Sequence, residues 1–235
     1  MKISIIIPVF NEEKTIKQIL HLIRETRLVK GLTKEVIVVD DASNDKTSKI
    51  IKGYNHQLKY FRQSSNKGKG AAVRLGLQNA SGEIIIIQDA DLEYNPNDYS
   101  KLLLPILNGE TKVVYGTRLK NYPLKFWGER KTVLPLNLIA NRFLTFLTNI
   151  LYNSHLTDME TCYKIFTRKL LEDIKLRANK FDFEPEITAK FLKRGYKIKE
   201  VPIVTQPRSY KEGKKIGWSD GVYAIWTLIK YRFVN

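Results

Sequence analysis

The sequence predicts one α/β domain, in which a mainly parallel sheet is flanked by helices and the C-terminal part contributes amphipathic helices. Short apolar runs alternate with helix-length periodic stretches through the first half of the 235 residues, as in parallel strands joined by crossover helices. Apolar residues make up 43% of the chain, enough for a sizeable buried core. Acidic residues and glycines cluster directly after the apolar runs, at the strand ends where such sheets bind ligands.

The first two strand-helix units follow from the residue pattern. The isoleucine-rich run 3–7 predicts a buried strand, and Asn11 is expected to cap a helix that reaches about residue 28. The run 35–39 predicts a second strand, and a second helix is expected to begin at Lys46. Repetition of this unit predicts neighbouring parallel strands.

The later elements continue this alternation and then depart from it. A strand, a helix, a strand, a helix and a strand are expected at about 59–62, 70–78, 84–87, 97–108 and 112–115. The aromatic segment 120–129 is expected to be irregular. Beyond it, a helix, a strand, a helix, an edge strand and a terminal helix are expected at about 132–151, 163–167, 184–194, 197–204 and 219–233.

Charge and cysteine content narrow the functional classes. Lysine and arginine number 40 against 24 acidic residues, and the formal charge of +16 favours an anionic partner such as nucleic acid, lipid headgroups or a phosphorylated substrate. The single cysteine, Cys162, excludes an internal disulfide and leaves no partner thiol for a cysteine-based metal site. This composition fits a reducing compartment.

Neither a membrane span nor a signal peptide is expected. The apolar run at the N-terminus is too short for a signal peptide. The segment closest to a span, 133–152, contains Arg142 and three asparagines, whereas a spanning helix needs about 18 or more uncharged apolar residues. We therefore expect a cytoplasmic protein that contacts the cytoplasmic face of a membrane only peripherally.

Carboxylates after the run 84–87 predict a divalent-metal site. Asp89 and Asp91, with Glu93 as a further ligand, present hard oxygen ligands of the kind that Mg²⁺ or Mn²⁺ binds. Such an ion bridges diphosphate oxygens and stabilises the charge of a leaving nucleoside diphosphate. Taken alone, a short Asp-X-Asp motif is more often a solvated turn than a metal site.

Other strand-end segments have both a functional and a structural interpretation. Asp41 could accept hydrogen bonds from a nucleobase or a ribose, whereas Asp45 is better explained as a helix cap. The segment 8–12 could place backbone groups against the base or serve as an ordinary strand-to-helix connection. The glycine-rich segment 67–70 could approach a diphosphate through backbone amides and lysine charge, or it could supply turn glycines alone.

Taken together, five motifs resemble glycosyltransferase family 2. They are IIPVFNE at 6–12, VVDDASND at 38–45, NKGKG at 66–70, DADLE at 89–93 and GTR at 116–118. Segments 157–166 and 183–216 extend the resemblance to the branch of the dolichyl-phosphate mannose and glucose synthases. The resemblance implies a GT-A fold with a Rossmann-like sheet and inversion at the sugar carbon. It also implies a nucleotide-sugar-binding half, 1–118, and an acceptor-side, membrane-proximal half, 119–235.

The resemblance assigns roles to individual residues of this chain. Nucleotide-binding positions of the family are matched by Pro8, Phe10, Glu12 and Asp41. Metal and diphosphate positions are matched by Asp89, Ala90 and Asp91, and a phosphate-contacting position is matched by Arg118. Several mannose synthases have glutamine where this chain has Glu93, so this residue departs from their pattern.

Basic residues in the second half are expected to contact phosphate. The loop 208–215 resembles a family loop that closes over the donor diphosphate and the acceptor phosphate, and its candidate residues are Arg208, Lys214 and Lys215. A solvated surface loop is the plain alternative. Arg130 has similar potential beside the aromatic segment.

The implied reaction moves mannose or glucose from GDP-mannose or UDP-glucose to a polyprenyl or dolichyl phosphate, with Asp91, Arg118 and Arg208 as the catalytic residues. A polyprenyl phosphate already has an anionic nucleophile, so it needs charge screening and alignment more than a base. A saccharide or lipid hydroxyl is the alternative acceptor and would favour a carboxylate base. The carboxylates available for that role, each of which could equally be structural, are Asp158, Glu184 and Glu186.

The surface has two further interpretations. Apolar and aromatic residues mixed with cations in 126–152 and 223–233 fit either peripheral contact with an anionic membrane surface or packing of amphipathic helices in the core. A basic module that binds nucleic acid is the non-enzyme alternative. The paired acidic strand ends disfavour that module, so no nucleic acid is expected as a partner.

Overall fold

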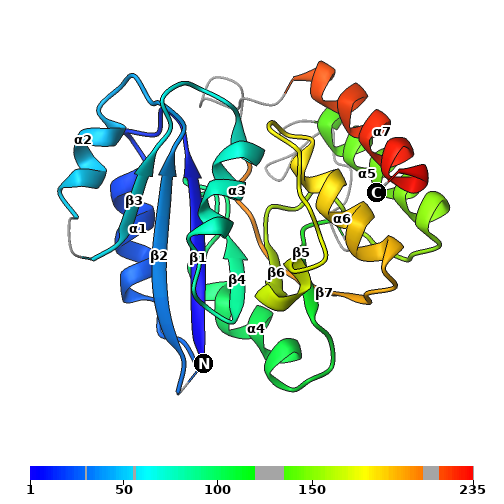
Figure 1. Cartoon of the computed structure of the whole chain (residues 1–235), viewed down its shortest axis with the longest axis horizontal. Helices are drawn as coiled ribbons and strands as arrows, with labels where there is room; N and C mark the ends of the chain where they lie inside the picture. The colour runs from blue at the N-terminus through cyan, green and yellow to red at the C-terminus, as the bar shows by residue number, and fades with distance from the viewer. Residues whose placement is uncertain (30, 55–56, 120–134, 209–216, 235) are drawn as a thin grey trace, which may run out of the picture.

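The computed structural model describes residues 1–29, 31–54, 57–119, 135–208 and 217–234 of the chain (Figure 1). These residues form a seven-stranded sheet that is flanked by helices. The prediction of a mainly parallel α/β fold is therefore confirmed. The segment expected to be irregular, 120–129, lies outside the described residues.

Across the sheet the strands lie in the order β3-β2-β1-β4-β6-β5-β7. Their bounds are β1 (Lys2–Val9), β2 (Thr33–Asp40), β3 (Lys59–Arg62), β4 (Ile84–Ile87), β5 (Val113–Thr117), β6 (Lys164–Thr167) and β7 (Ile198–Pro202). Neighbouring strands are parallel except where β6 is involved, because β6 runs antiparallel to both β4 and β5. The expected edge strand, β7, does lie at an edge.

The direction of β6 has a consequence for the site. An antiparallel strand begins at the end of the sheet where its parallel neighbours finish. The loop that precedes β6 therefore lies at the carboxyl ends of β4 and β5, beside the segments that follow these strands. The apolar run predicted this strand but not its direction.

The helices lie close to the predicted positions. Their bounds are α1 (Ile16–Glu25), α2 (Thr47–Lys52), α3 (Lys69–Gln78), α4 (Tyr99–Leu107), α5 (Pro135–Tyr152), α6 (Phe183–Lys193) and α7 (Trp218–Phe233), with short 3₁₀ turns at Pro96–Asp98 and Arg168–Leu171. Strand and helix ends differ from the expectations by a few residues. The main exception is the start of α1.

Asn11 does not cap α1, so this prediction was wrong. Its backbone is in the left-handed region with φ at 50°, and its side-chain oxygen accepts a hydrogen bond from the amide of Asn44 at 2.9 Å. The amide of Asn11 in turn donates to the hydroxyl of Ser43 at 2.9 Å. The loop after β1 is thus tied to the loop after β2, and α1 begins only after Thr15.

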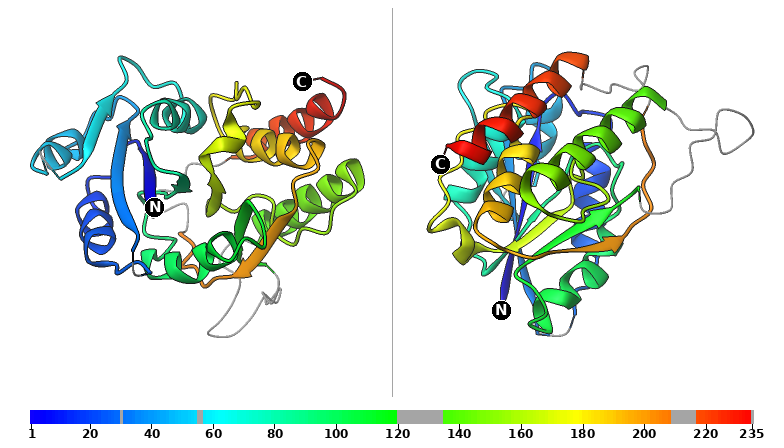
Figure 2. Two further views of the ribbon diagram at one scale, coloured as in Figure 1. Left: turned by 60° about the horizontal axis from the view of Figure 1, so that its bottom comes forward. Right: turned by 90° about the vertical axis from the view of Figure 1, so that its right-hand side faces the viewer.

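The core of the described residues has two main parts, besides a small cluster of Ile37, Val39 and Ala72. The larger part surrounds β1 and β4, where the four isoleucines of β4 are buried on both faces; each such side chain contributes about 1.5–3 kcal/mol to folding. A smaller cluster, which includes Leu144, Met159, Ala189 and Leu228, joins α5, α6 and α7. In Figure 2, α5 and α7 lie side by side in green and red, with α6 against them. Within the described ranges, no helix is long and apolar enough to cross a bilayer.

Candidate functional site

Arg208 joins three strand-end segments at the carboxyl edge of the sheet. Its guanidinium lies 3.0 and 3.1 Å from the two carboxylate oxygens of Glu12, after β1, and 3.2 Å from Asp91 Oδ2, after β4. Its backbone amide donates to Glu93 Oε1 at 2.9 Å. Three carboxylates that the sequence proposed for nucleotide and metal binding are therefore gathered around one cation.

Lys69 lies beside the first aspartate of the Asp-X-Asp motif. Its ammonium group is 2.9 Å from Asp89 Oδ1 and 2.8 Å from Glu184 Oε1 on α6. Burial alone would lower the pKa of Lys69, but the charges of Asp89 and Glu184 raise it well above its usual range. Burial would likewise raise the pKa of Asp89, and the charge of Lys69 lowers it overall. Both groups are therefore charged at neutral pH.

Asp91 lies in a region of concentrated negative charge. Burial, followed by the charges of Asp89 and Glu93, raises the pKa of Asp91 to about 7. Its Oδ1 accepts a hydrogen bond from the amide of Glu93 at 3.1 Å, so the turn after β4 holds the carboxylate in place. A second positive charge at this position would relieve the repulsion between the carboxylates.

The residues around Asp91 fit a divalent ion that is completed by substrate oxygens. Among the described residues there is no group of three or more histidine, cysteine or acidic side chains that could hold a metal by itself, so the three-carboxylate set of Asp89, Asp91 and Glu93 is not preassembled. Mg²⁺ is commonly bound by one or two carboxylates together with substrate phosphates and water. Asp89 and Asp91 are the carboxylates that would hold such an ion, and in this structure each is paired with a cation, Lys69 or Arg208. Glu93 instead accepts the amide of Arg208.

Arg118 and Asp158 form a bidentate ion pair at the end of β5, in which Asp158 is fully buried and the side chain of Arg118 is 17% exposed. The guanidinium lies 2.7 Å from Asp158 Oδ2 and 2.8 Å from Oδ1, and the backbone amide of Arg118 also donates to Oδ2 at 2.9 Å. Glu200 fixes the other side of the pair by accepting the backbone amides of Thr157 and Asp158. Burial alone would lower the pKa of Arg118, but Asp158 raises it well above its usual range.

Four backbone amides in and beside segment 67–70 are already bonded within the protein. Asp41 accepts the amides of Lys67 and Gly68 at 2.8 and 2.7 Å. The amides of Gly70 and Ala71 donate to backbone carbonyls in 179–180. The expectation that these four amides would bind a diphosphate is therefore wrong. The segment contributes to the site through the side chain of Lys69.

The glycines of this segment are required by close packing. Gly68 has φ at +98°, and a Cβ atom there would lie 2.5 Å from the carbonyl oxygen of Asn179. A Cβ atom on Gly70 would lie 2.7 Å from the carbonyl oxygen of Ala178. The structural interpretation of these glycines is therefore sufficient to explain them.

Asp41 and Asp45 hold loops in place. Asp41 is buried and also accepts a hydrogen bond from Gln63 Nε2 at 2.7 Å. Burial is the main cause that raises the pKa of Asp41, although the amides of Lys67 and Gly68 oppose it. Asp45 accepts the amide of Thr47 at 2.9 Å in the turn before α2, but the N-cap position of that helix is Lys46, so Asp45 stabilises the turn and is not the N-cap residue.

The remaining candidates fall into three groups. Pro8 lies near the end of β1, Phe10 directly follows that strand, and Ala90 is buried between the two aspartates. Glu186 accepts the amides of Arg177 and Ala178 and pairs with Lys190, contacts that favour a structural role over that of a base. The candidates outside the described residues are Arg130, Lys214 and Lys215.

Sequence reasoning missed Glu160 and Lys164. Lys164 is fully buried, and its ammonium group donates to the carbonyl oxygens of Met159 and Thr161 at 2.8 and 2.6 Å. Glu160 lies in the loop that precedes β6 and has a buried carboxylate oxygen. The local sequence gives no signal for either residue, because a charged side chain beside or within a strand is ordinarily exposed to solvent.

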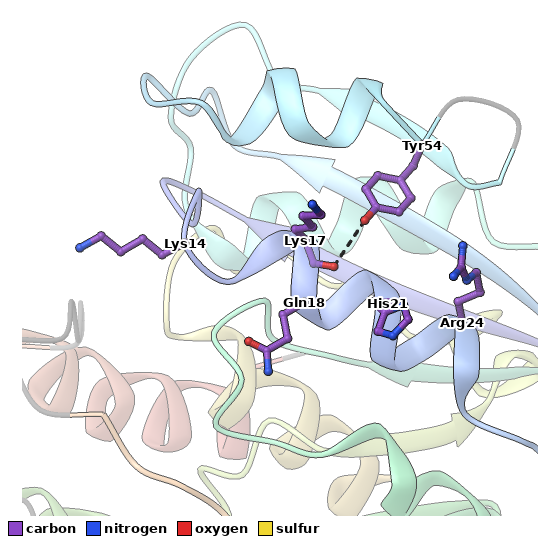
Figure 3. A pocket seen from close by; sticks show the side chains of 6 residues that line it. All are labelled: Lys14, Lys17, Gln18, His21, Arg24 and Tyr54. Atoms are coloured by element: carbon purple, nitrogen blue, oxygen red, sulfur yellow. Dashed lines mark hydrogen bonds between the residues drawn. The ribbon is translucent and has the colours of Figure 1, made fainter.

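A pocket on α1 is separate from this group of residues (Figure 3). It is lined by Lys14, Lys17, Gln18, His21, Arg24 and Tyr54. The hydroxyl of Tyr54 donates to the carbonyl oxygen of Lys17 at 3.5 Å. The lining contains no carboxylate and none of the strand-end residues described above, so it does not extend the site.

Comparison with known proteins places the chain in a family. Residues 4–175 match the profile of Glycosyl transferase family 2. A UDP-N-acetylglucosamine–dolichyl-phosphate N-acetylglucosaminyltransferase of Methanococcus voltae is 30% identical over 223 residues, which cover 86% of this chain and 85% of that protein. A dolichol-phosphate mannosyltransferase of Pyrococcus furiosus is 33% identical over 130 residues, which cover 52% of this chain and 36% of that protein.

Solved structures support the fold. Glucosyl-3-phosphoglycerate synthase of Mycobacterium tuberculosis, in complex with Mn²⁺, UDP and phosphoglyceric acid, superposes with a TM-score of 0.74 at 22% identity, covering 100% of this chain and 79% of that chain. The GT-A fold implied by the motifs is thereby confirmed. With its motifs in order along the chain and its acidic pair at the end of β4, this protein belongs to glycosyltransferase family 2, in the branch that resembles the dolichyl-phosphate sugar transferases.

Proposed function

We propose that this glycosyltransferase moves a hexosyl unit from a nucleotide sugar to a polyprenyl phosphate such as dolichyl phosphate, with inversion at the anomeric carbon. The names of the Methanococcus voltae and Pyrococcus furiosus relatives support this acceptor class. Mannose from GDP-mannose or glucose from UDP-glucose is the transfer implied by the motifs. N-Acetylglucosamine is a third sugar to compare, because the first of these relatives is named for it.

The observation that carries the proposal is the pairing of Arg118 with Asp158. Both carboxylate oxygens of Asp158 bond to the guanidinium, so this carboxylate is already used as the partner of a cation. A hydroxyl acceptor would need a base at the site. A phosphate acceptor supplies its own anionic oxygen and needs a fixed positive charge. The geometry of this pair favours the phosphate.

The acidic pair and its cations would hold the donor. Asp89 and Asp91 would bind Mg²⁺ or Mn²⁺, which would neutralise the donor diphosphate and stabilise the leaving nucleoside diphosphate. Lys69 fixes Asp89 by an ion pair of 2.9 Å. Arg208 reaches both Asp91 and the Glu12 loop, so it is placed to contact the diphosphate once the donor enters.

Arg118 would then serve the acceptor. Its guanidinium is held by Asp158 in a fixed orientation and would screen the charge of the lipid phosphate. Alignment and screening of this kind let an anionic oxygen approach the anomeric carbon on the face opposite the leaving diphosphate. Inversion follows from a single displacement with that geometry. Arg130, Lys214 and Lys215 remain further proposed phosphate contacts.

Exposed apolar stripes on α5 and α7 support peripheral binding to an anionic membrane surface. On α5 the exposed apolar residues are Leu136, Ile139, Phe143, Phe146 and Ile150. On α7 they are Trp218, Val222, Tyr223, Trp226, Ile229 and Phe233. The spacing of three and four residues places each stripe along one side of its helix. Such helices lie in the headgroup region with their apolar face buried, and the charge of +16 favours anionic lipid.

This arrangement would bring the catalytic edge to a lipid acceptor at the membrane surface. The cytoplasmic face is the proposed location, because a single cysteine fits a reducing compartment. The first part, 1–118, would bind the nucleotide sugar, and 119–235 would present the acceptor side.

The test of this proposal is a transfer assay with the purified chain. Mn²⁺ or Mg²⁺, a polyprenyl phosphate and one of GDP-mannose, UDP-glucose or UDP-N-acetylglucosamine are combined, and lipid and nucleotide products are identified by mass spectrometry. A glycosyl-phosphoryl lipid is expected from one donor. A parallel reaction with the corresponding polyprenol separates the acceptor classes, because product from the alcohol alone would favour a hydroxyl acceptor. Salt-sensitive oligonucleotide binding without nucleotide-sugar binding would favour the nucleic-acid alternative.

A further inference from the structure

Unpartnered polar atoms gather around the proposed active site. Within the part of the chain that the structure describes, three buried side-chain atoms have no hydrogen-bond partner: Glu160 Oε1, Thr161 Oγ1 and Arg208 Nε. Buried polar atoms nearly always have a partner, so exceptions call for a ligand or an ordered water. Arg208 already joins Glu12 and Asp91, and the other two atoms belong to the loop before β6.

The loop that carries Glu160 is fixed on both sides. On one side, Asp158 is paired with Arg118 at 2.7 Å. On the other, the amide of Cys162 donates to the hydroxyl of Tyr94 at 3.0 Å, in the segment that follows the Asp-X-Asp motif. Glu160 therefore lies between the residues that would hold the acceptor phosphate and those that would hold the donor diphosphate.

Charges from several elements act on Glu160. Burial, followed by the charge of Glu184 on α6, raises its pKa, whereas Lys164 on β6 and Arg118 after β5 lower it and Asp158 raises it. The resulting pKa is about 8, so the carboxyl group is protonated at neutral pH. A protonated carboxyl group has one O–H donor and an acceptor oxygen, which together complement a sugar hydroxyl.

We infer that Glu160 contacts the transferred sugar and donates or accepts a hydrogen bond at one of its hydroxyl groups, so that it helps to set the preference for the donor sugar. This inference rests on the proposed function. The sugar must lie between the diphosphate that it leaves and the nucleophile that it joins, and the loop before β6 lies between the residues assigned to these two groups. The unpartnered Oε1 is the atom that the sugar would satisfy.

Two substitutions distinguish this role from that of a base. Glu160→Gln keeps a neutral side chain with a donor and an acceptor, whereas Glu160→Ala removes both. A base would be lost in either variant. A sugar contact should survive in Glu160→Gln within about threefold and should weaken about tenfold in Glu160→Ala, which is the loss expected for one or two hydrogen bonds. The exposed Glu172→Gln is the matched control.

The experiment measures donor binding by calorimetry in the presence of Mn²⁺, with the nucleotide sugar and, separately, with its free nucleoside diphosphate. Glu160→Ala is expected to weaken binding of the nucleotide sugar but not of the nucleoside diphosphate. Donors that each lack one hydroxyl group extend the test. One of them should bind the wild-type protein as weakly as the natural donor binds Glu160→Ala. The affinity for that deoxygenated donor should be the same in the wild type and in Glu160→Ala. Thermal unfolding of each variant shows that it is folded.

Four outcomes of the binding and transfer assays are decisive. If Glu160→Ala binds every sugar donor like the wild type, the inference is overturned. If both variants keep donor affinity but lose turnover alike, Glu160 is a base and the sugar contact is rejected. If the wild type binds no nucleotide sugar, the proposed function itself fails. If it binds donors but does not glycosylate a lipid phosphate, only the acceptor is wrong, and the binding comparison still decides the role of Glu160.

Discussion

The guanidinium of Arg208 forms two hydrogen bonds with the carboxylate of Glu12, a residue 196 positions earlier in the chain. The same guanidinium lies 3.2 Å from Asp91. One side chain therefore couples the loop after β1, the motif after β4 and the segment that follows β7. This relationship makes Arg208 the centre of the proposed donor site and gives the first prediction.

Replacing Arg208 should impair transfer more than it impairs folding. We expect Arg208→Gln to lower kcat/KM by about 100-fold, because a cation placed at the developing diphosphate charge is lost. Arg208→Lys should recover only part of this activity, since a single ammonium group cannot match the two-point contact with Glu12. Steady-state kinetics with the exposed Arg27→Gln as the control checks this expectation. Equal rates for Arg208→Gln and the control would exclude the assigned role.

Asp91→Asn should abolish metal-dependent transfer while leaving the fold intact. The substitution removes one of the two expected metal-binding carboxylates and also relieves its repulsion with Asp89 and Glu93. The midpoint of thermal unfolding should therefore stay the same or rise. Titration with Mn²⁺, followed by electron paramagnetic resonance, should show weaker binding of the ion in the presence of the nucleoside diphosphate. Full turnover by this variant, or by the wild type in excess chelator, would contradict the proposed metal site.

Gly68→Ala should destabilise the protein far more than Gly109→Ala. Both glycines have a positive φ, at +98° and +73°, which L side chains rarely adopt. With ψ at 166°, Gly68 also lies in a backbone region that is essentially restricted to glycine. Only at Gly68 does the added Cβ atom also meet backbone, 2.5 Å from the carbonyl oxygen of Asn179, whereas nothing lies within 4 Å at Gly109. Chemical denaturation of the two variants gives the comparison. Equal losses in the free energy of unfolding would show that the loop can shift away.

The protonated state of Glu160 predicts a pH dependence of stability. Its pKa is raised from 4.5 to about 8 in the folded protein, mainly by burial and then by Glu184. Between these two values the folded protein holds a proton that the unfolded chain releases. The resulting contribution to the free energy of unfolding is complete below pH 4.5 and is lost as the pH rises to about 8. Glu160→Gln should remove it, because an amide does not titrate in this range.

Denaturation of the wild type and of Glu160→Gln at several pH values between 5 and 8 tests this expectation. The free energy of unfolding of the wild type should fall relative to that of the variant as the pH rises. Other groups that titrate in this range are present in both proteins, so the difference isolates residue 160. A constant difference would mean that Glu160 is ionised throughout.

Removing exposed aromatic residues from α5 and α7 should weaken membrane binding. Phe146 and Trp226 are 60% and 62% exposed, so Phe146→Ser combined with Trp226→Ser should cost little stability. Sedimentation with vesicles that contain anionic lipid should show less bound protein for this variant. Leu104→Ser is the control, because Leu104 is an exposed apolar residue on α4, at 45%. Equal binding by wild type, variant and control would reject these helices as the contact surface.

The sequence alone determined the elements and the family. Continuous apolar runs such as Ile84–Ile87 are buried on both faces, so their composition is enough to identify a central strand. The carboxylates that follow this run lie at the ligand edge because parallel strands all end there. These inferences depend on local periodicity and on the order of motifs, and both are properties of short segments.

Only the tertiary structure decided how the loops are used. Nothing in the local pattern of β6 shows that it runs antiparallel, yet this direction brings Glu160 and Asp158 to the site. Most amides of the glycine-rich segment are also committed to distant partners, because Lys67 and Gly68 donate to Asp41, and Gly70 and Ala71 donate to the backbone of 179–180. Such partners are distant in sequence, and a hydrogen-bonding group in a loop gives no sign of which distant group it will meet. The local pattern of apolar residues thus determines the helices and strands, because hydrophobic burial acts on short segments. The polar pairs at the site depend instead on which distant segments the fold brings together.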